Sequence, residues 1–253
     1  MSFGAAVARA YGIARSVGMY YGPVWRRGRM EAFYRQFLRS GDLAFDIGSH
    51  VGNRIRTFRR LGVRVVAVEP QPDFARLIRF FYGRDPGVAI EECGIASVSR
   101  HGSLFVSTRT PTLSTSAAGW MQDVQADERF NAIRWDRKIA IPLVTLEDLI
   151  ARHGEPQFCK IDVEGSEADV LGGLERPLAA VSFEYIPVAV DRAAACIARL
   201  DQLGDYRYRF SRAETMEWGC AEWVDGPDIL ALLRAMPLGD RSGDVYARRV
   251  SPR

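Results

Sequence analysis

Acidic residues and glycines stand together in the segment from Asp46 to Asn53, which reads Asp-Ile-Gly-Ser-His-Val-Gly-Asn. The segment follows a short apolar run and precedes a helix-like stripe, which is where an open α/β sheet binds a nucleotide-like ligand. Glycines let the backbone approach a ligand, and the start of a helix offers free N–H groups to a carboxylate. Asp46 would accept hydrogen bonds from an ammonium group. The alternative, a tight turn with an acidic cap, explains the glycines but not the position of Asp46.

A second acidic residue, Glu69, follows the β-branched run Val65–Val68. A carboxylate at the end of this strand can accept hydrogen bonds from both hydroxyls of a ribose. The alternative is a role at the start of the helix that Pro70 introduces. Together the two segments indicate an adenosyl ligand. The glycines follow G-x-x-x-G rather than G-x-G-x-x-G, which counts against a dinucleotide.

A third polar segment runs from Lys160 to Glu167 and again joins a predicted strand to a predicted helix. Charges inside an apolar run cost free energy unless they are paired or used. We therefore expect Asp162 and Glu164 at the ligand crevice; the alternatives are a Lys160–Asp162 ion pair and capping of the following helix. Two acids could also hold a divalent cation, but no third ligand is identifiable, so no metal is predicted.

Three further residues are candidates with a plain alternative each. Glu184 lies near the end of the predicted strand 181–186 and faces the same crevice by topology. It would orient a substrate hydroxyl, or else pair with one of the many arginines. His50 is a possible base, or an ordinary surface histidine. Trp120 lies in the long segment 109–137, where its ring would stack on a sugar or simply cover the core. No Ser-His-Asp triad or zinc pattern is visible.

The elements that must position these residues alternate between strand-like and helix-like patterns. Apolar runs predict strands at 43–47, 63–68, 88–95, 158–163 and 181–186. Apolar stripes of helical period predict helices at 30–38, 51–61, 74–81 and 190–203. This order is typical of a doubly wound, mostly parallel α/β sheet. We predict one such domain over 40–253, preceded by an N-terminal helical extension over 1–39.

Composition speaks against several other classes of protein. The 253 residues are 47% hydrophobic and 26% charged, which indicates a globular protein. A net charge of +3 gives no argument for a nucleic-acid partner. No apolar run approaches about eighteen residues, so no membrane span is expected. The four cysteines lack metal-type spacing, and a reducing compartment, the cytoplasm, is the expected location.

Taken together, the motifs resemble those of the FkbM family of S-adenosylmethionine-dependent methyltransferases, over roughly residues 40–190. The resemblance rests on D-x-G-x-x-x-G from Asp46, E-P-x-P from Glu69, the Thr-Leu-Glu-Asp segment at 145–148, and K-x-D-x-E-G-x-E from Lys160. The chain departs from the family at Glu147, where Asp is frequent, and at His50, where Ala or Asn is common.

The resemblance implies a Rossmann-like sheet of the class I methyltransferase type with an antiparallel final strand. It implies S-adenosylmethionine as cofactor and a hydroxyl of a saccharide or other natural product as acceptor. The implied cofactor-binding residues are Asp46, Gly48, Ser49, Gly52, Asn53, Glu69, Cys93, Gly94, Ile95 and Asp162. The candidates for the general base are, in order, Asp162, Glu164 and His50; Glu184 and Trp120 would contact the acceptor.

Two other functions stay open at this point. An NAD-dependent oxidoreductase would share the sheet, although the missing glycine pattern speaks against it. A non-catalytic scaffold would keep the fold without the chemistry. The motifs specify neither the acceptor nor the oligomeric state.

Overall fold

The structure is a computed structural model that describes residues 11–12, 15–16, 18, 25–125 and 132–250. In the predicted extension over 1–39, residues 1–10, 13–14, 17 and 19–24 lie outside the described residues. Its described helix, α2 (Trp25–Tyr34), places Met30, Phe33 and Tyr34 in the hydrophobic core.

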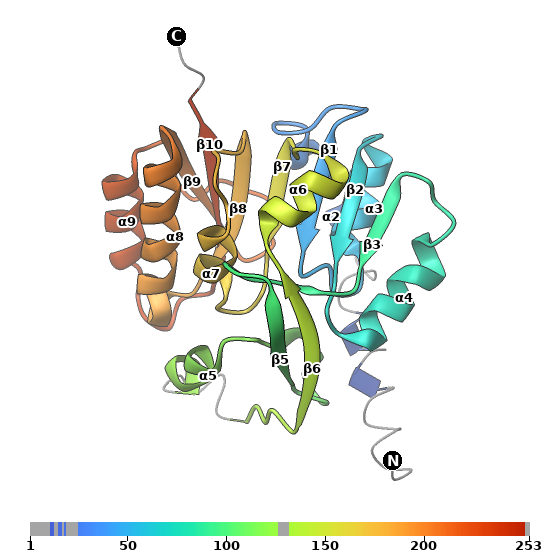
Figure 1. The fold of residues 1–253 in the computed structure, drawn as a ribbon. Coiled ribbons are helices and arrows are strands. Elements are labelled where there is room, and N and C mark those ends of the chain that lie inside the picture. The colour runs from blue at the N-terminus through green and yellow to red at the C-terminus, as the bar shows by residue number, and fades with distance from the viewer. Residues whose placement is uncertain (1–10, 13–14, 17, 19–24, 126–131, 251–253) are drawn as a thin grey trace.

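Seven strands form the main sheet, in the order β3-β2-β1-β7-β8-β10-β9 (Figure 1). Their bounds are Val88–Glu91 (β3), Arg64–Val68 (β2), Leu43–Ile47 (β1), Phe158–Ile161 (β7), Ala180–Tyr185 (β8), Gly243–Arg249 (β10) and Tyr206–Arg212 (β9). The strands from β3 to β8 pair in parallel, and β10 runs antiparallel to both of its neighbours. The predicted mostly parallel sheet with an antiparallel final strand is confirmed.

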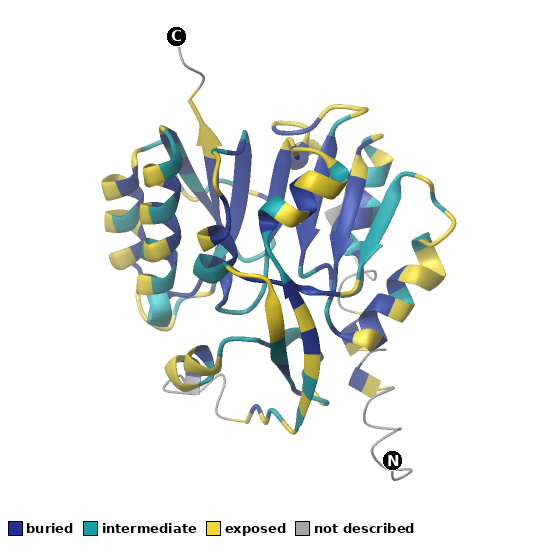
Figure 2. Cartoon of the chain, in the orientation of Figure 1, coloured by how far each residue is buried: buried dark blue, intermediate teal, exposed yellow. Residues whose placement is uncertain are grey.

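Helices cover both faces of this sheet because its strands are apolar on both sides (Figure 2). Phe45 and Ile47 of β1 share a core with α6 (Leu146–His153), α7 (Glu167–Gly172), α8 (Val190–Leu203) and α9 (Gly226–Arg234). Ala44, which precedes Phe45 in sequence, faces the opposite side, where α2, α3 (Asn53–Arg60) and α4 (Pro72–Tyr82) pack. The alternation of side chains along each strand thus divides the core into two layers.

Local sequence explains where some helices begin. Thr145 caps α6 by accepting a hydrogen bond from the Asp148 backbone N–H, and the Asp148 side chain accepts one from the Thr145 backbone in return. Asp225 caps α9 in a similar way, and Pro227 stands in its first turn. Both helix starts agree with the sequence pattern. Across the described residues, no helix combines the length and the apolar character needed to cross a membrane.

A second sheet of three strands was not predicted. It contains β4 (Gly94–Ile95), β6 (Arg137–Val144) and β5 (Arg100–Val106), in that order, beyond the carboxyl ends of the parallel strands (Figure 1). The single strand predicted over 88–95 is therefore two strands. Its first half pairs with β2, whereas Gly94 and Ile95 pair with Leu143 and Val144 of β6. The chain leaves the main sheet here because the second sheet has an apolar cluster of its own, which includes Leu104 and Ile141.

The segment 109–137, predicted as a loop, contains regular structure. A 3₁₀ turn covers Pro111–Leu113, and the helix α5 covers Ala118–Gln125. Residues 126–131 lie outside the described residues. The segment lies with the second sheet at the carboxyl-end side of the main sheet, where the predicted crevice is.

Candidate functional site

The turn after β1 is built by close contact with the loop after β7. Gly48 has φ +82°, and a Cβ on it would lie 1.8 Å from the carbonyl oxygen of Asp162. A larger residue is therefore excluded by both conformation and space. The Asp162 backbone N–H donates to the carbonyl of Ile47 at 2.9 Å, which ties the two loops together. Ser49 donates to the carbonyl of Asp46 at 2.7 Å and so stabilises the same turn.

Glu69 is held at the end of β2 by two backbone amides. Its Oε2 accepts from the His50 N–H at 2.7 Å, and its Oε1 accepts from the Gln71 N–H at 2.8 Å. Burial raises the pKa of Glu69 to about 7, although both hydrogen bonds favour the ionised form. The carboxyl group is thus fixed in position and close to balance between its two protonation states at neutral pH.

Glu69 borders a pocket between the two sheets, which we call the apolar pocket. Its apolar lining comes from Phe74 on α4, Ile95 on β4, Leu104 on β5 and Ile141 on β6. Sequence reasoning found Glu69 and Ile95 but missed the other three side chains. Leu104 and Ile141 carried no signal because the second sheet that presents them was not predicted.

A neighbouring pocket, the polar pocket, has a charged lining. It is bordered by Asp46 of β1, Asn53 and Arg54 of α3, and Glu214 of the segment after β9. Both pockets share five lining residues: Gly48, His50, Thr112, Asp162 and Glu164. The two pockets therefore meet above the carboxyl ends of β1 and β7. The predicted residues Asp162, Glu164 and His50 stand at this junction.

Asp46 faces the polar pocket from inside the sheet. The residue is 1% exposed, and its Oδ2 has no hydrogen-bond partner among the residues described. Burial raises the pKa of Asp46 to about 6, against the nearby charges of Arg54 and Lys160. A buried oxygen without a donor indicates a site for a ligand that brings one.

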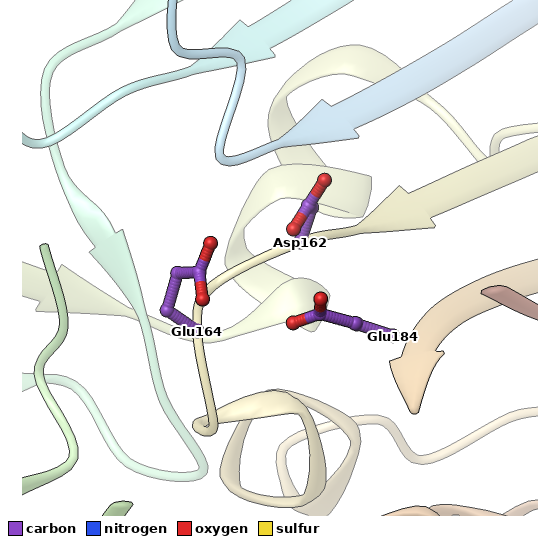
Figure 3. Close-up of side chains that lie close together, drawn as sticks. All are labelled: Asp162, Glu164 and Glu184. Carbon is purple, nitrogen blue, oxygen red and sulfur yellow. The ribbon is translucent and has the colours of Figure 1, made fainter. Parts of the chain in front are cut away.

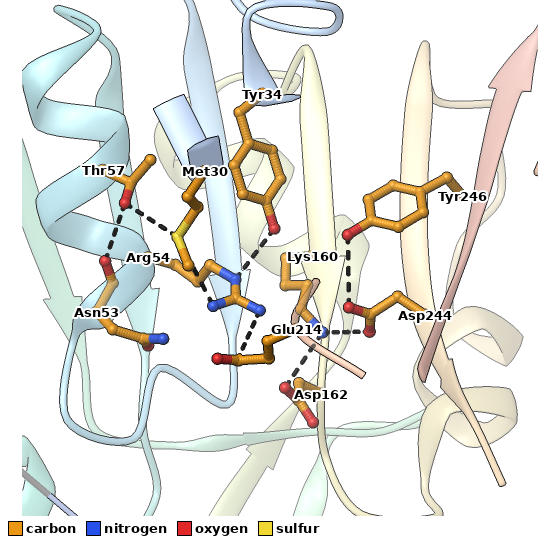
Figure 4. A network of polar contacts seen from close by, with 10 residues as sticks. All are labelled: Met30, Tyr34, Asn53, Arg54, Thr57, Lys160, Asp162, Glu214, Asp244 and Tyr246. Atoms are coloured by element: carbon orange, nitrogen blue, oxygen red, sulfur yellow. Dashed lines mark hydrogen bonds and ion pairs between the residues drawn. The ribbon is translucent and has the colours of Figure 1, made fainter. Parts of the chain in front are cut away.

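Arg54 of α3 lines the polar pocket and belongs to a network of polar contacts (Figure 4). Its Nε donates to the Tyr34 hydroxyl at 3.0 Å, and its guanidinium pairs with Glu214 at 2.9 Å. Sequence reasoning missed both Arg54 and Glu214. One of many arginines does not stand out, and the contact joins residues 160 positions apart.

Lys160 connects Asp162 to a second carboxylate (Figure 4). The residue is 1% exposed, and its Nζ lies 3.1 Å from Asp162 Oδ2 and 2.8 Å from Asp244 Oδ1. The Lys160–Asp162 ion pair, which was the alternative suggested by the sequence, is thus present. Lys160 also pairs with Asp244. Burial alone would raise the pKa of Asp162, but the charges of Lys160 and Arg54 outweigh it and hold the pKa below its usual value.

Asp162, Glu164 and Glu184 bring their carboxyl groups together, with oxygens within 4.8 Å of one another (Figure 3). Burial and the repulsion from Glu184 and Asp162 raise the pKa of Glu164 well above its usual value. Glu184, predicted as a residue that orients the substrate, thus supplies the third carboxylate that was not identified as a cation ligand from the sequence. Three such oxygens suit a hard cation in principle, but the ammonium of Lys160 already lies beside one of them.

His50 adopts a left-handed conformation, with φ +49°, at the junction of the pockets. Its ring lies against Phe74, with centroids 4.1 Å apart. Burial lowers the pKa of His50 to about 4, so the imidazole is neutral and only weakly basic.

Four predicted cofactor residues do not border either pocket. Ser49 and Gly52 shape the turn, and Gly52 stands at the start of α3 with φ +80°. Cys93 is buried, which raises the pKa of its thiol to about 11, and Gly94 pairs with β6. Their contribution in this structure is to the path of the chain.

Trp120 and Glu184 border a third, smaller pocket between α5 and α8. Trp120 is 1% exposed and packs edge-on against Trp135, with ring centroids 6.1 Å apart. A Cβ on Gly165 would lie 2.2 Å from the Trp120 ring, so the loop after β7 lies directly on the indole. This agrees with the alternative in which Trp120 covers the core, and not with a ring open to a sugar.

Comparison with known proteins places this site in a family. A family model described as "Methyltransferase FkbM domain" matches residues 46–211, and no curated protein matches the chain. Among solved structures, a precorrin-6y C5,15-methyltransferase from Geobacter metallireducens has 10% identity and a TM-score of 0.48, covering 88% of this chain and 87% of that one. A TehB-like S-adenosylmethionine-dependent methyltransferase from Corynebacterium glutamicum has 9% identity and a TM-score of 0.46, covering 88% of both chains.

The matched region extends over more than half of the chain and contains each polar segment of the junction, from Asp46 through Glu69 and Lys160 to Glu184. This assignment replaces the NAD-dependent oxidoreductase considered from the sequence. The chain belongs to the FkbM family of S-adenosylmethionine-dependent methyltransferases.

Proposed function

We propose that S-adenosylmethionine lies along both pockets, with its adenosine in the apolar pocket and its methionine part in the polar pocket. Phe74, Ile95, Leu104 and Ile141 offer an apolar surface to the adenine. Glu69 would accept hydrogen bonds from the ribose hydroxyls, since two backbone amides fix its carboxyl group beside this surface.

The observation that carries this proposal is the unpartnered Oδ2 of Asp46, buried at the far end of the same crevice. A ligand ammonium would supply the missing donors. Asn53 begins α3, whose free N–H groups and the adjacent Arg54 would favour the ligand carboxylate. An acid for the amine and a positive helix end for the carboxylate suit the two groups of an amino acid.

This placement leaves the junction of the pockets for methyl transfer. The cofactor supplies a methyl group already activated on a sulfonium, so the protein chiefly has to position the acceptor and handle its proton. Glu164 borders both pockets, and its raised pKa makes its carboxylate a stronger base than that of an ordinary glutamate. Asp162, with its lowered pKa, and His50, with a pKa of about 4, are weaker bases. We therefore assign the base to Glu164 and acceptor orientation to Asp162.

The acceptor would be a hydroxyl of a saccharide or a similar hydroxyl-rich molecule. Thr112, Ser114 and Ser116 line the apolar pocket on the side of the second sheet, and Thr112 also borders the polar pocket. Hydroxyl side chains can both donate and accept, which suits a ligand that carries several hydroxyls. These residues, rather than Trp120, would contact the acceptor.

The test combines methyl-labelled S-adenosylmethionine with a panel of mono- and oligosaccharides, with formation of S-adenosylhomocysteine as the readout. We expect transfer to at least one hydroxyl compound and a loss of at least about tenfold in Glu164→Gln. Glu222→Gln, an exposed glutamate elsewhere, is the control and should keep full activity. Transfer to nitrogen or carbon acceptors alone would contradict the proposal, and cofactor binding without any transfer would favour the scaffold.

A further inference from the structure

Glu164 and Glu184 are neighbouring glutamates without a direct partner for their charges in the part of the chain that the structure describes. The structure gives the side chains of Glu164 and Glu184 no hydrogen bond or ion pair from the residues it describes, and Glu164 Oε2 is fully enclosed. Their carboxyl oxygens nevertheless lie within 4.8 Å of each other and of Asp162 (Figure 3). Two adjacent carboxylates without a counter-charge are costly to keep ionised together.

The neighbouring charged groups are committed elsewhere. Lys160 pairs with Asp162 and Asp244. Glu167 on α7 accepts from the backbone amides of Val163 and Gly165.

The charged groups on the other neighbouring elements also have partners of their own. Arg192 on α8 donates to Asp123 and to the Gly165 carbonyl, and Arg54 on α3 pairs with Glu214. His50 is neutral because burial lowers its pKa to about 4. Each of these described cations forms its ion pair or hydrogen bond with another group, and the charge of Lys160 is outweighed by the burial and the carboxylate repulsion that raise the pKa of both glutamates.

We propose that Glu164 and Glu184 share a single proton at neutral pH, and that Glu184 is a positioning residue that acts through Glu164. The catalytic part of this inference rests on the proposed function, whereas the shared proton does not. Glu184 stands on β8 and borders neither cofactor pocket, while Glu164 borders both. When the shared proton is on Glu184, Glu164 is ionised and faces the acceptor.

The reaction then balances without a further reactant. The acceptor oxygen forms a bond to the methyl carbon, and its proton passes to Glu164. The bond from that carbon to sulfur breaks, and its electron pair stays on sulfur as a neutral thioether. The proton leaves Glu164 for solvent when the product departs, which restores the pair with one proton.

A shared proton fits this site better than a bound cation. A cation among the three carboxylates would lie close to the Lys160 ammonium, which is 3.1 Å from Asp162 Oδ2. Like charges at such distances repel strongly where water is excluded. A proton relieves the Glu164–Glu184 repulsion and adds no charge beside Lys160.

Carbon-13 NMR of the ligand-free protein, labelled at the glutamate carboxyl carbons, tests this without any acceptor. Glu164→Gln and Glu184→Gln assign the two resonances by difference, with circular dichroism as the check on folding. In the wild type we expect both resonances to follow the same two titration steps, as coupled groups do. In each variant the remaining glutamate should show one step. Its acid dissociation constant should be at least about tenfold larger than that of the wild-type step at higher pH.

Two controls separate coupling from a structural effect. Glu184→Asp keeps the charge and should retain the two steps, and it serves to assign the Glu164 resonance if Glu184→Gln fails to fold. Glu222→Gln should leave both resonances unchanged. Independent single steps in the ordinary glutamate range would overturn the proposal. So would a shift of both resonances by one equivalent of Mg²⁺, because it would show a cation in place of the proton. Neither outcome depends on finding the acceptor, so failure here is distinct from failure of the O-methylation assay.

Discussion

Replacing Glu69 by glutamine changes the one side chain that we place on the ribose, at nearly constant size. Each carboxylate oxygen accepts a backbone N–H, at 2.7 Å from His50 and 2.8 Å from Gln71. The amide keeps one acceptor and turns its NH₂ group toward a backbone donor. Hydrogen bonds to a charged group are worth about 1.5–3 kcal/mol each. The Kd for S-adenosylhomocysteine should therefore rise at least about tenfold at pH 8.

The pH dependence follows from the pKa of about 7 that burial gives Glu69. The ionised form is the better acceptor for two hydroxyls, so affinity is lost as pH falls through the pKa. The ionised fraction is about 0.9 at pH 8 and about 0.1 at pH 6, so the wild-type Kd should rise about tenfold over this interval. Glu69→Gln has no charge to lose at this position. The ratio of variant to wild-type Kd should therefore shrink about tenfold from pH 8 to pH 6.

Isothermal titration calorimetry with S-adenosylhomocysteine at pH 6, 7 and 8 measures this ratio. Titration of the ligand contributes equally to both proteins and cancels in the comparison. The interval from pH 7 to pH 8 lies above the pKa of about 6 of Asp46, whose charge interacts with that of Glu69. A folded Glu69→Gln variant that binds as tightly as the wild type would refute the ribose assignment. A weaker variant whose ratio stays constant with pH would refute the reasoning about the charge of Glu69.

Other substitutions test the remaining assignments. Asp162→Asn leaves Lys160 paired with Asp244, so the Tm should change little while methyl transfer per folded molecule falls at least about tenfold; a collapsed Tm with normal residual turnover would show a structural role instead. Lys160→Met leaves two carboxylates without their cation and should lower the free energy of unfolding in urea by about 3–5 kcal/mol; a loss below about 1 kcal/mol would speak against the ion pairs. Trp120→Ala should cost about 3–5 kcal/mol because the ring is packed inside the protein, and an unchanged stability with a raised acceptor KM would instead restore the sugar-stacking role. Asp46→Asn should raise the Kd for S-adenosylhomocysteine about tenfold at pH 8 and less at pH 5, where Asp46 is protonated in the wild type; equal effects at both pH values would contradict the ammonium contact.

The residues that sequence reasoning located are those fixed by a local pattern. Asp46 and Glu69 each end a buried strand just before a helix, and the topology of a parallel sheet brings such ends to one edge. Thr145 could be read as a helix start because its capping partner is three residues away. The fold class follows from the same short-range periods.

The features that were missed depend on contacts between distant parts of the chain. Arg54 meets Glu214 across 160 positions, and Lys160 meets Asp244 across 84. The apolar pattern of β6 is typical of a strand, but such a pattern does not say which sheet the strand joins. The topology predicted Glu184 at the same crevice, but the close approach of its carboxyl group to Asp162 and Glu164 is likewise a product of tertiary packing.

A crystal structure with S-adenosylhomocysteine would test directly whether the cofactor lies along the apolar and polar pockets. We expect the ribose hydroxyls within hydrogen-bond distance of Glu69, the ligand amine beside Asp46, and the sulfur at the junction lined by Gly48, Asp162 and Glu164. A ligand with its adenine in the polar pocket, or with its sulfur away from Glu164, would contradict the proposed placement of the cofactor.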